Sequence, residues 1–347
     1  MTIECPAPQH EDEVVLLGHG AGGRLTEELL DQIVLPPLDG GAGGSGPLED
    51  AALLPGHREL VISTDGFVVS PLFFPGGDIG SLAVHGTVND LAMRGAWPIA
   101  LSVSLIIEEG LPLAELRAVM DSLGKAAQEA GVPVVTGDTK VVGRGAADRL
   151  FVNTTGIGQR RGCLHPSAAL ARPGDAVLLS GPIGLHGTAV LSIREGLGFG
   201  GDIASDSRPL HRLVRALAPL GAAVHVLRDP TRGGLAAALN EIARDSSVAV
   251  EIEESSVPVP ETVAAACDLL GLDPLVVANE GCLVAFVAAA AAEDTLAALR
   301  SRPEGAGAVR IGEVLPGGPP GRVTLRTLVG ARRIVDMPLG EQLPRIC

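Results

Sequence analysis

The chain has 347 residues, more than one hydrophobic core usually supports, so two domains are expected. Hydrophobic residues make up 46% and charged residues 19%, a balance typical of a folded α/β protein and not of a disordered chain. The formal net charge of −15 argues against nucleic acid and membranes as partners, because both attract basic surfaces. No apolar run is long enough to span a bilayer and the acidic start lacks a signal-peptide pattern, so we expect a cytoplasmic protein.

Hydrophobic patterns in residues 1–162 predict a first domain of mixed strands and helices. Helical spacing of apolar residues predicts helices at 25–33, 79–93 and 112–130. The helix at 112–130 has one apolar face, formed by Leu113, Leu116, Met120, Leu123 and Ala127. Runs of apolar residues, many of them β-branched, predict strands at 14–17, 59–64, 99–107, 132–136 and 150–158.

Residues 163–337 predict a second domain of the same α/β class. Strands are predicted at 175–180, 248–252 and 282–287, and helices at 188–194, 209–220, 235–245, 261–270 and 288–299. Two prolines and a glycine in the last residues predict that 338–347 is a flexible tail.

Acidic residues stand at several chemically suggestive positions. Asp65 and Asp138 each follow a predicted strand, Asp90 lies in an otherwise apolar helix, and Glu49 and Asp50 form a fourth acidic point. Carboxylates at strand ends converge on one edge of a sheet, where several oxygens would suit Mg²⁺. Each aspartate taken alone is equally explained as a helix cap or turn residue, but one shared site accounts for the set better.

The segment GHGAGG at 18–23 matches a phosphate-binding glycine pattern through Gly18, Gly20 and Gly23. Backbone N–H groups in such a segment can cradle phosphate. An NAD site of the Rossmann type is the alternative, with Asp39 as the acid that binds ribose. A glycine-rich connector occupies the place of the second strand that a Rossmann unit needs, and the chain has no Walker A motif.

Three further positions suit phosphate or proton chemistry. The segment DPTRGG at 229–234 precedes a helix, so Arg232 and free N–H groups there suit an anion, although a capped helix with a surface arginine fits equally well. Lys140 suits a phosphate contact or a proton relay, and otherwise is a surface lysine. Glu280 suits a general base, and otherwise is a turn residue.

The last residue, Cys347, is a cysteine. The five cysteines are widely spaced and form no CxxC pair, which indicates reduced thiols. A terminal cysteine is not a prenylation signal, because that signal needs three residues after it. Its position can be chance, but a thiol on a flexible tail can reach its own active site or a neighbour's. Arg345 would favour its thiolate, and the terminal carboxylate would oppose it.

Together these segments resemble the HypE family of hydrogenase-maturation carbamoyl dehydratases. The matching residues are STDGFVVSPLFFPGGDIG, GTVNDLAMRGAWP, EEGLP, VTGDTKVVGRG, RDPTRGG, ANEG and the terminal PRIC. The likeness covers nearly the whole chain. The middle motifs are shared with aminoimidazole ribonucleotide synthetase and selenophosphate synthetase, whereas PRIC at the C-terminus is specific to HypE.

The resemblance implies a two-domain PurM-like fold and a homodimer whose sheet forms the interface, with ATP and Mg²⁺ bound by the first domain. It implies that Mg²⁺ is held by Asp50, Asp65, Asp90 and Asp138. The nucleotide would also contact Gly20, Gly22, Gly23, Thr139, Asp229 and Arg232. Glu49 stands where relatives often have aspartate, and Cys282 is assigned no role.

The resemblance also implies the reaction. A carbamoyl group on the Cys347 sulfur would be phosphorylated by ATP on its oxygen and would lose phosphate to become a thiocyanate. Glu280, helped by Lys140, would remove the nitrogen protons. The carbamoyltransferase HypF would supply the carbamoyl group, and the HypC–HypD complex would accept the cyanide for the hydrogenase iron.

Two other functions remain open from the sequence. A related ATP enzyme acting on a free substrate would not need Cys347. A carrier that hands over a metal through the terminal thiol would bind metal and turn over no ATP, but a single thiol is a poor metal site.

Overall fold

Two β-sheets with their covering helices form the molecule. The computed structural model describes residues 23–29, 52–54, 59–196, 203–338 and 345–347. The strand predicted at 14–17 and the end of the helix predicted at 25–33 lie outside these residues. The part of that helix that is described is α1 (Arg24–Leu29). None of the described helices combines the length and apolarity that crossing a bilayer requires.

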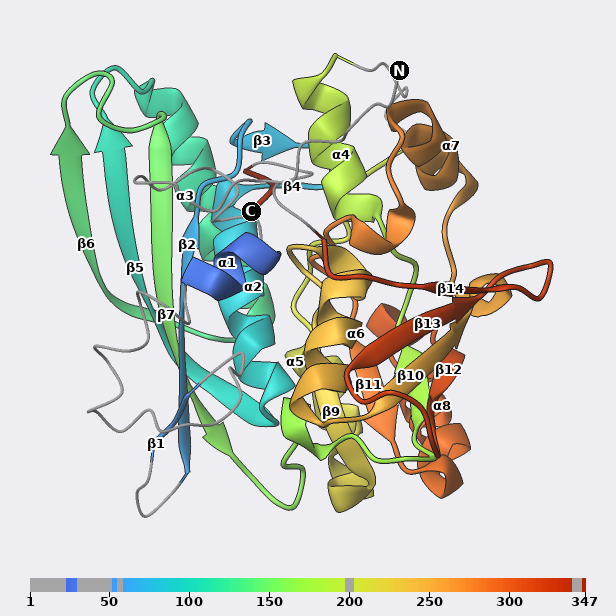
Figure 1. The fold of residues 1–347 in the computed structure, drawn as a ribbon. Helices are drawn as coiled ribbons and strands as arrows, with labels where there is room; N and C mark the ends of the chain where they lie inside the picture. The colour runs from blue at the N-terminus through green and yellow to red at the C-terminus, as the bar shows by residue number, and fades with distance from the viewer. Residues whose placement is uncertain (1–22, 30–51, 55–58, 197–202, 339–344) are drawn as a thin grey trace, which may run out of the picture.

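The first sheet has five strands and is covered by helices on one face (Figure 1). Its order is β1 (Ala52–Leu54), β2 (Leu60–Phe67), β7 (Leu150–Arg160), β5 (Ala96–Glu108) and β6 (Val134–Val142). Neighbours are antiparallel except for the parallel pair β5 and β6. The covering helices are α2 (Ile79–Met93) and α3 (Leu113–Ala130), and a short hairpin of β3 (Phe73–Phe74) and β4 (Gly77–Asp78) precedes α2.

Helix α2 is enclosed on all sides, since every residue except Ser81 and Asp90 is buried. It contacts the first sheet, α3 and elements of the second half of the chain. Its irregular apolar pattern follows from this position, because a fully buried helix has no polar face. Asp78 caps its N-terminus by accepting from the N–H groups of Gly80 and Ser81.

Helix α3 is amphipathic, but its buried face differs from the predicted one. Val119, Leu123 and Ala126 are buried, whereas Leu113 is 78% and Met120 37% exposed. The predicted face is confirmed at Leu123 and Ala127, which are buried, and Leu116 packs against the same cluster. It is wrong at Leu113 and Met120, because the crossing with α2 decides which residues α3 buries.

The second sheet has seven strands, and only β10 and β13 run parallel. Its order is β14 (Arg332–Ile334), β13 (Arg322–Arg326), β10 (Ala249–Glu253), β12 (Val309–Leu315), β8 (Ala176–Leu179), β11 (Val284–Val287) and β9 (Val224–Arg228). The helices of this half are α4 (Leu185–Arg194), α5 (His211–Ala216), α6 (Gly234–Asp245), α7 (Glu261–Leu270) and α8 (Ala292–Arg300). Each corresponds to a predicted helix, but β9 and β12–β14 were not predicted.

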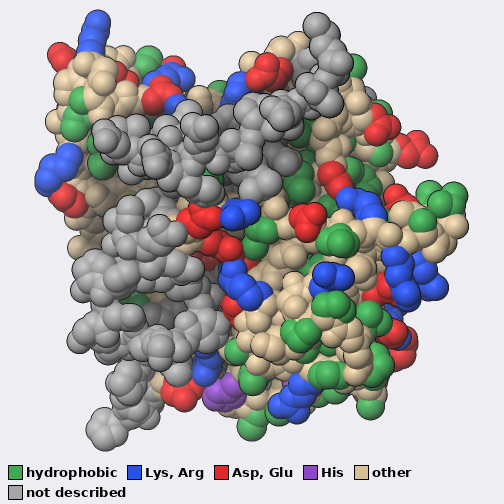
Figure 2. Space-filling view, in the orientation of Figure 1, with side chains coloured by type: hydrophobic (Ala, Val, Ile, Leu, Met, Phe, Trp, Pro, Cys, Tyr) green, Lys and Arg blue, Asp and Glu red, His purple; other side chains and the backbone are tan. Residues whose placement is uncertain are grey.

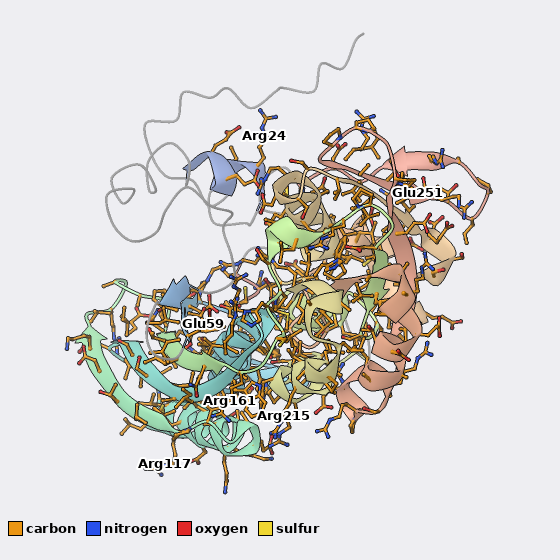
Figure 3. The ribbon with its side chains drawn as sticks, turned by 90° about the horizontal axis from the view of Figure 1, so that it is seen from below. Arg24, Glu59, Arg117, Arg161, Arg215 and Glu251 are labelled. Carbon is orange, nitrogen blue, oxygen red and sulfur yellow. The ribbon has the colours of Figure 1, made fainter. Side chains whose placement is uncertain are left out.

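Trp97 of β5 joins the two halves of the chain. The guanidinium groups of Arg161 and Arg215 stand 4.5 and 4.3 Å from its ring centroid. Arg215 belongs to α5, so these cation–π contacts join the first sheet to the second half. The two arginines lie side by side at the junction of the halves (Figure 3).

The close crossing of α2 and α3 gives a stability prediction. A Cβ on Gly80 would stand 2.3 Å from the carbonyl oxygen of Val119, whereas a Cβ on Gly124 would meet nothing within 4 Å. We expect Gly80→Ala to lower the free energy of unfolding by about 1–3 kcal/mol through overpacking. Gly124→Ala, the matched control, should raise it by up to about 1 kcal/mol because alanine favours the helix. Urea unfolding of both variants checks this, and equal effects would contradict it.

Candidate active site

The C-terminus is buried between the two halves of the molecule (Figure 1). Cys347 is 8% exposed and packs in the same hydrophobic cluster as Phe67, the last residue of β2, and Val69. The Val68 N–H donates to the Cys347 carbonyl oxygen at 3.2 Å, and the Ser70 N–H donates to that of Arg345 at 3.2 Å. The last three residues are therefore docked in their own chain; residues 339–344 lie outside the described part.

Side chains from the second half also hold these residues. His186 of α4 contacts the Ile346 carbonyl oxygen through Nε2 at 2.8 Å. Arg194, at the end of α4, donates to the Arg345 carbonyl oxygen at 2.7 Å and to that of Ser70. All three tail carbonyl groups are thus bonded to residues distant in sequence.

The Cys347 thiol is uncharged in this environment. Burial raises its pKa to about 12, while the guanidinium of Arg232 acts in the opposite direction and Glu280 and Asp65 add to the rise. Arg345, expected to favour the thiolate, instead pairs with Asp148 and donates to the Val68 carbonyl oxygen. The expectation for Arg345 is wrong, because the cation that lowers the pKa of the Cys347 thiol is Arg232.

Glu280 is the carboxyl group beside this thiol, and it is 3% exposed. Burial raises its pKa well above the usual range, and the negative charges of Asp229, Asp206 and Asp65 raise it further against the effect of Arg232. A carboxyl group with a raised pKa can hold or accept a proton near neutral pH, as acid–base chemistry requires.

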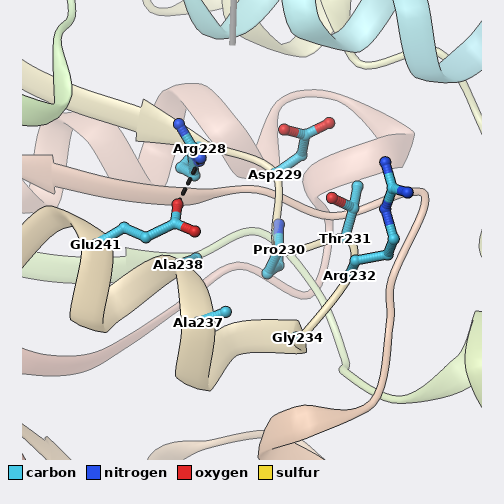
Figure 4. Close-up of a pocket in the computed structure, with 9 residues that line it drawn as sticks. All are labelled: Arg228, Asp229, Pro230, Thr231, Arg232, Gly234, Ala237, Ala238 and Glu241. Carbon is cyan, nitrogen blue, oxygen red and sulfur yellow. Dashed lines mark hydrogen bonds and ion pairs between the residues drawn. The ribbon is translucent and has the colours of Figure 1, made fainter. Parts of the chain in front are cut away.

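Arg232 connects the site to the start of α6. Its pKa is raised mainly by Cys347, with Asp65, Glu280 and Asp90 acting in the same direction. The loop before α6 borders a cavity of about 160 Å³, which is lined by Arg228, Asp229, Pro230, Thr231, Arg232, Gly234, Ala237, Ala238 and Glu241. In Figure 4, Asp229 and Arg232 point to the same side of this loop, away from the Arg228–Glu241 ion pair.

Gly234 has a positive φ of 62°, and a Cβ there would stand 2.5 Å from the Leu275 carbonyl oxygen. The second glycine of DPTRGG therefore lets the loop pack against the segment that leads to Glu280. Of the predicted pair, Arg232 interacts electrostatically with Cys347, and Asp229 with Glu280.

Asp65 and Asp90 belong to the same group of charges. Ser63 and Asp65 share the inner face of β2, and the Ser63 hydroxyl donates to Asp90 of α2 at 2.5 Å. Both carboxylates raise the pKa of Arg232. One site of interacting charges therefore contains five predicted residues: Cys347, Glu280, Arg232, Asp65 and Asp90. Figure 2 shows acidic and basic side chains gathered along this junction.

Asp138, Thr139 and Lys140 lie away from this site, on strand β6. Asp65 and Asp138 lie inside β2 and β6, so the expectation that they end their strands is wrong. In the register of the sheet, Asp65 is aligned with Thr154, Val103 and Gly137 on successive strands. Side chains alternate between the two faces along a strand, so Asp138, the residue after Gly137, lies on the face opposite Asp65. Strands β7 and β5 separate the two, a backbone distance of about 14 Å. Asp138 pairs with Lys140 at 2.7 Å on the exposed side, and Thr139 lies between them.

Part of the predicted nucleotide site falls outside the described residues, namely Gly20, Gly22, Glu49 and Asp50. Gly23 is described and buried, and the N–H of the next residue, Arg24, donates to the Pro338 carbonyl oxygen at 3.2 Å. Within the described ranges, no three His, Cys, Asp or Glu side chains are grouped so as to hold a metal. Of the four predicted metal ligands, Asp65 and Asp90 lie at this site, and their carboxylate oxygens are of the kind that Mg²⁺ prefers.

Two residues at the site were not predicted. Asp206 accepts from the N–H groups of Glu280 and Gly281 at 3.1 and 2.9 Å, and His186 holds Ile346. Neither lies in a motif or has a regular spacing, so the sequence contains no signal for them.

Comparison with known proteins identifies the family. Residues 48–159 match the N-terminal domain of AIR synthase related proteins, and residues 172–323 match the C-terminal domain. Carbamoyl dehydratase HypE of Cupriavidus necator is 53% identical over 331 residues, which cover 95% of this chain and 94% of that protein.

Two solved structures extend the match to the fold. One is a HypE–HypF complex, with 47% identity and a TM-score of 0.84 over 91% of this chain and 100% of that one. The other is HypE in complex with ATP, with 50% identity and a TM-score of 0.81 over 96% of this chain and 100% of that one. The predicted α/β, two-domain PurM-like fold is confirmed, and this chain belongs to the HypE family of carbamoyl dehydratases.

Proposed function

We propose that this chain is an ATP-dependent carbamoyl dehydratase that acts on its own C-terminal cysteine and so supplies cyanide for hydrogenase maturation. The observation that carries this proposal is the position of Cys347, which is docked in its own chain beside Arg232, Glu280 and Asp65. A terminal residue that served no reaction would not need a buried site lined with ionisable groups, because burying such groups costs free energy.

The reaction converts –S–C(=O)NH₂ on Cys347 into –S–C≡N. ATP supplies a phosphoryl group to the carbamoyl oxygen, and the carbon–oxygen bond then breaks so that this oxygen leaves in inorganic phosphate. The nitrogen gives up two protons as the triple bond forms. ADP, phosphate and the thiocyanate are the products, so atoms and charge balance once the released protons are counted.

The described residues have different roles in this reaction, which follow from their charges. Arg232 lies near the sulfur and near Glu280, where its guanidinium stabilises negative charge that develops on the carbamoyl oxygen. Glu280 accepts a nitrogen proton, and its raised pKa makes the carboxyl group basic enough for that transfer. Asp229, in the loop before α6, adds negative charge near Glu280 and so contributes to its raised pKa.

ATP and Mg²⁺ would bind next to this group, as the ATP complex of a HypE relative supports. Asp65 and Asp90 would hold Mg²⁺ from this subunit, with Asp50 and the glycines Gly20, Gly22 and Gly23 completing the nucleotide contacts. Mg²⁺ would offset charge on the phosphoryl oxygens. Asp138 and Lys140 would act from the second subunit of a homodimer, because their side chains lie on the face of the sheet opposite Asp65. Thr139, between them in β6, is proposed as a further nucleotide contact.

The surface of the first sheet supports that homodimer. The helices cover one face, and apolar side chains remain exposed on the other, among them Ile106 and Ile157, each 41% exposed. Removing such side chains from water favours association. We place the domain boundary at 162/163 and propose that residues 338–347 undock as a mobile tail when Cys347 meets its partners.

The partners would be HypF as carbamoyl donor, supported by the HypE–HypF complex of a relative, and the HypC–HypD complex as cyanide acceptor. A cytoplasmic location would suit these partners.

Replacing the terminal cysteine tests the substrate. After incubation with HypF, carbamoyl phosphate and Mg-ATP, we expect the wild-type intact mass to gain a carbamoyl group and then to lose water. Cys347→Ala should keep its unmodified mass, because the sulfur that carries the group is absent. The measurement is intact-protein mass spectrometry. Equal unmodified masses for both proteins, with ATP still hydrolysed, would instead indicate a free substrate.

Neutralising Glu280 tests the proton acceptor. We expect Glu280→Gln to slow loss of water from carbamoylated Cys347 by a factor of about 10²–10⁴, the usual contribution of a general base. Glu261→Gln, at the exposed start of α7, is the control and should behave as wild type. The rate is followed by mass after ATP addition. A Glu280→Gln rate within twofold of wild type would remove Glu280 from this role.

Mixed dimers test the contribution of Asp138 across the interface. Asp138→Asn should be inactive, and Cys347→Ala has no substrate thiol. Heterodimers of the two, isolated with different affinity tags, should dehydrate carbamoylated Cys347 at about half the wild-type level. In each heterodimer the subunit with Cys347 receives an intact Asp138 from its partner. An inactive heterodimer would mean that Asp138 acts within its own subunit.

A further inference from the structure

Residues 203–208 contact Glu280 directly and the docked tail through His186. This segment lies between α4 and α5, and it carries three consecutive polar residues, Ser205, Asp206 and Ser207. None of the three was predicted to belong to the site, and the reaction described above does not use them.

Asp206 fixes the backbone of Glu280. Its two carboxylate oxygens accept from the N–H groups of Glu280, at 3.1 Å, and Gly281, at 2.9 Å. Burial raises the pKa of Asp206, and these two N–H groups oppose that rise by stabilising its ionised form. A Cβ on Gly281 would stand 1.7 Å from the Asp206 carbonyl oxygen, so the two segments are in direct backbone contact and only glycine fits there.

Ser205 acts on the tail through His186. The Ile346 carbonyl oxygen can only accept a hydrogen bond, so Nε2 of His186 must carry the proton. Burial lowers the pKa of His186 to about 4, so the ring is neutral and its Nδ1 is an acceptor. The Ser205 hydroxyl therefore donates to Nδ1 at 2.8 Å, while its oxygen accepts from the Ser207 N–H at 3.1 Å. Ser205 thus selects the ring tautomer that binds the tail.

The segment is itself anchored to the first half of the chain. The Ser205 N–H donates to the Pro75 carbonyl oxygen at 2.8 Å, in the turn between β3 and β4. The Ser207 hydroxyl contacts Nδ1 of His85 in α2 at 3.0 Å. Asn89 of α2 donates to the carbonyl oxygens of Arg208, at 3.1 Å, and Glu280, at 3.4 Å. These bonds hold residues 203–208 in place relative to both Glu280 and His186.

We propose that residues 203–208 set the position of Cys347 relative to Glu280, with Asp206 placing the carboxyl group and Ser205, through His186, placing the tail. Ser205, Asp206 and His186 are positioning residues, since none touches the reacting atoms. The inference rests on the proposed function, because it concerns the distance between the substrate sulfur and the proton acceptor. Such alignment strongly affects the rate of a reaction step.

Two readouts test the proposal on the full-length protein. The first is the rate of water loss from carbamoylated Cys347 after ATP addition. The second is the rate at which iodoacetamide alkylates uncarbamoylated Cys347, measured by peptide mass relative to exposed Cys163 in the same molecule. Wild-type Cys347 should react slowly, because it is buried and its pKa is about 12. The second readout needs no catalysis, so it remains valid if the proposed function fails.

His186→Gln and His186→Asn form a matched pair. The glutamine amide reaches about as far as Nε2 and can still donate to Ile346, whereas the asparagine amide reaches only as far as Nδ1. We expect His186→Asn to raise Cys347 alkylation and to slow water loss, each by about tenfold, the effect of one lost hydrogen bond. His186→Gln should stay within about threefold of wild type. Ser205→Ala, a smaller change, should shift both readouts in the direction of His186→Asn.

Asp206→Asn tests the other end of the segment. It should slow water loss by about tenfold or more and leave Cys347 alkylation unchanged, because the tail contact is intact. Thermal unfolding confirms that each variant is folded, and Ser205→Ala replaces any His186 variant that is not. The proposal is overturned if folded His186→Asn or Ser205→Ala leaves Cys347 as protected as in wild type. It is also overturned if His186→Gln changes water loss and alkylation as much as His186→Asn does. A wild-type rate of water loss in Asp206→Asn would overturn it too.

Discussion

The burial of ionisable groups around Arg232 is the constraint on which the rest of the site depends. Cys347 and Glu280 are both removed from water, which raises both pKa values, and Arg232 is the cation that opposes this effect on each. In a low-dielectric site the interaction between such charges is much stronger than in water. The arrangement keeps the thiol neutral while it is docked, and an S-carbamoyl group (a thiocarbamate), which is also neutral, suits the same environment.

The packing of the two halves brings these charges together. Helix α2 is buried on every side, yet it presents Asp90 to the junction beside β2. The loop before α6 supplies Arg232, and the segment before β11 supplies Glu280. Because α2, α6 and the first sheet are held by extensive packing, these side chains meet in a defined geometry beside the docked tail. The tail places its sulfur at this site through hydrogen bonds to its backbone, and these bonds do not involve the thiol itself.

Local patterns predicted much of the fold. The helices α2 and α7 have the predicted ends, since a cap, a proline or a glycine marks them in the sequence. Strands β9 and β12–β14 were not predicted, because each combines its apolar residues with charged ones and is stabilised by neighbours distant in the chain. The buried face of α3 was predicted only in part for a similar reason: several faces of the helix are apolar enough to be buried, and the crossing with α2 selects one.

The sequence by itself determined the family, the two α/β halves and the chemical identity of the main groups, including the terminal cysteine. These features depend on residue type and short-range spacing, which the sequence states directly. Only the tertiary structure decided that Asp138 lies on the face opposite Asp65, that Arg232 and not Arg345 acts on the thiol, and that Asp206 and His186 belong to the site. Asp206 and Glu280 are 74 residues apart, and His186 and Ile346 are 160 apart. Contacts over such separations depend on how complete elements pack, and no local pattern encodes that packing.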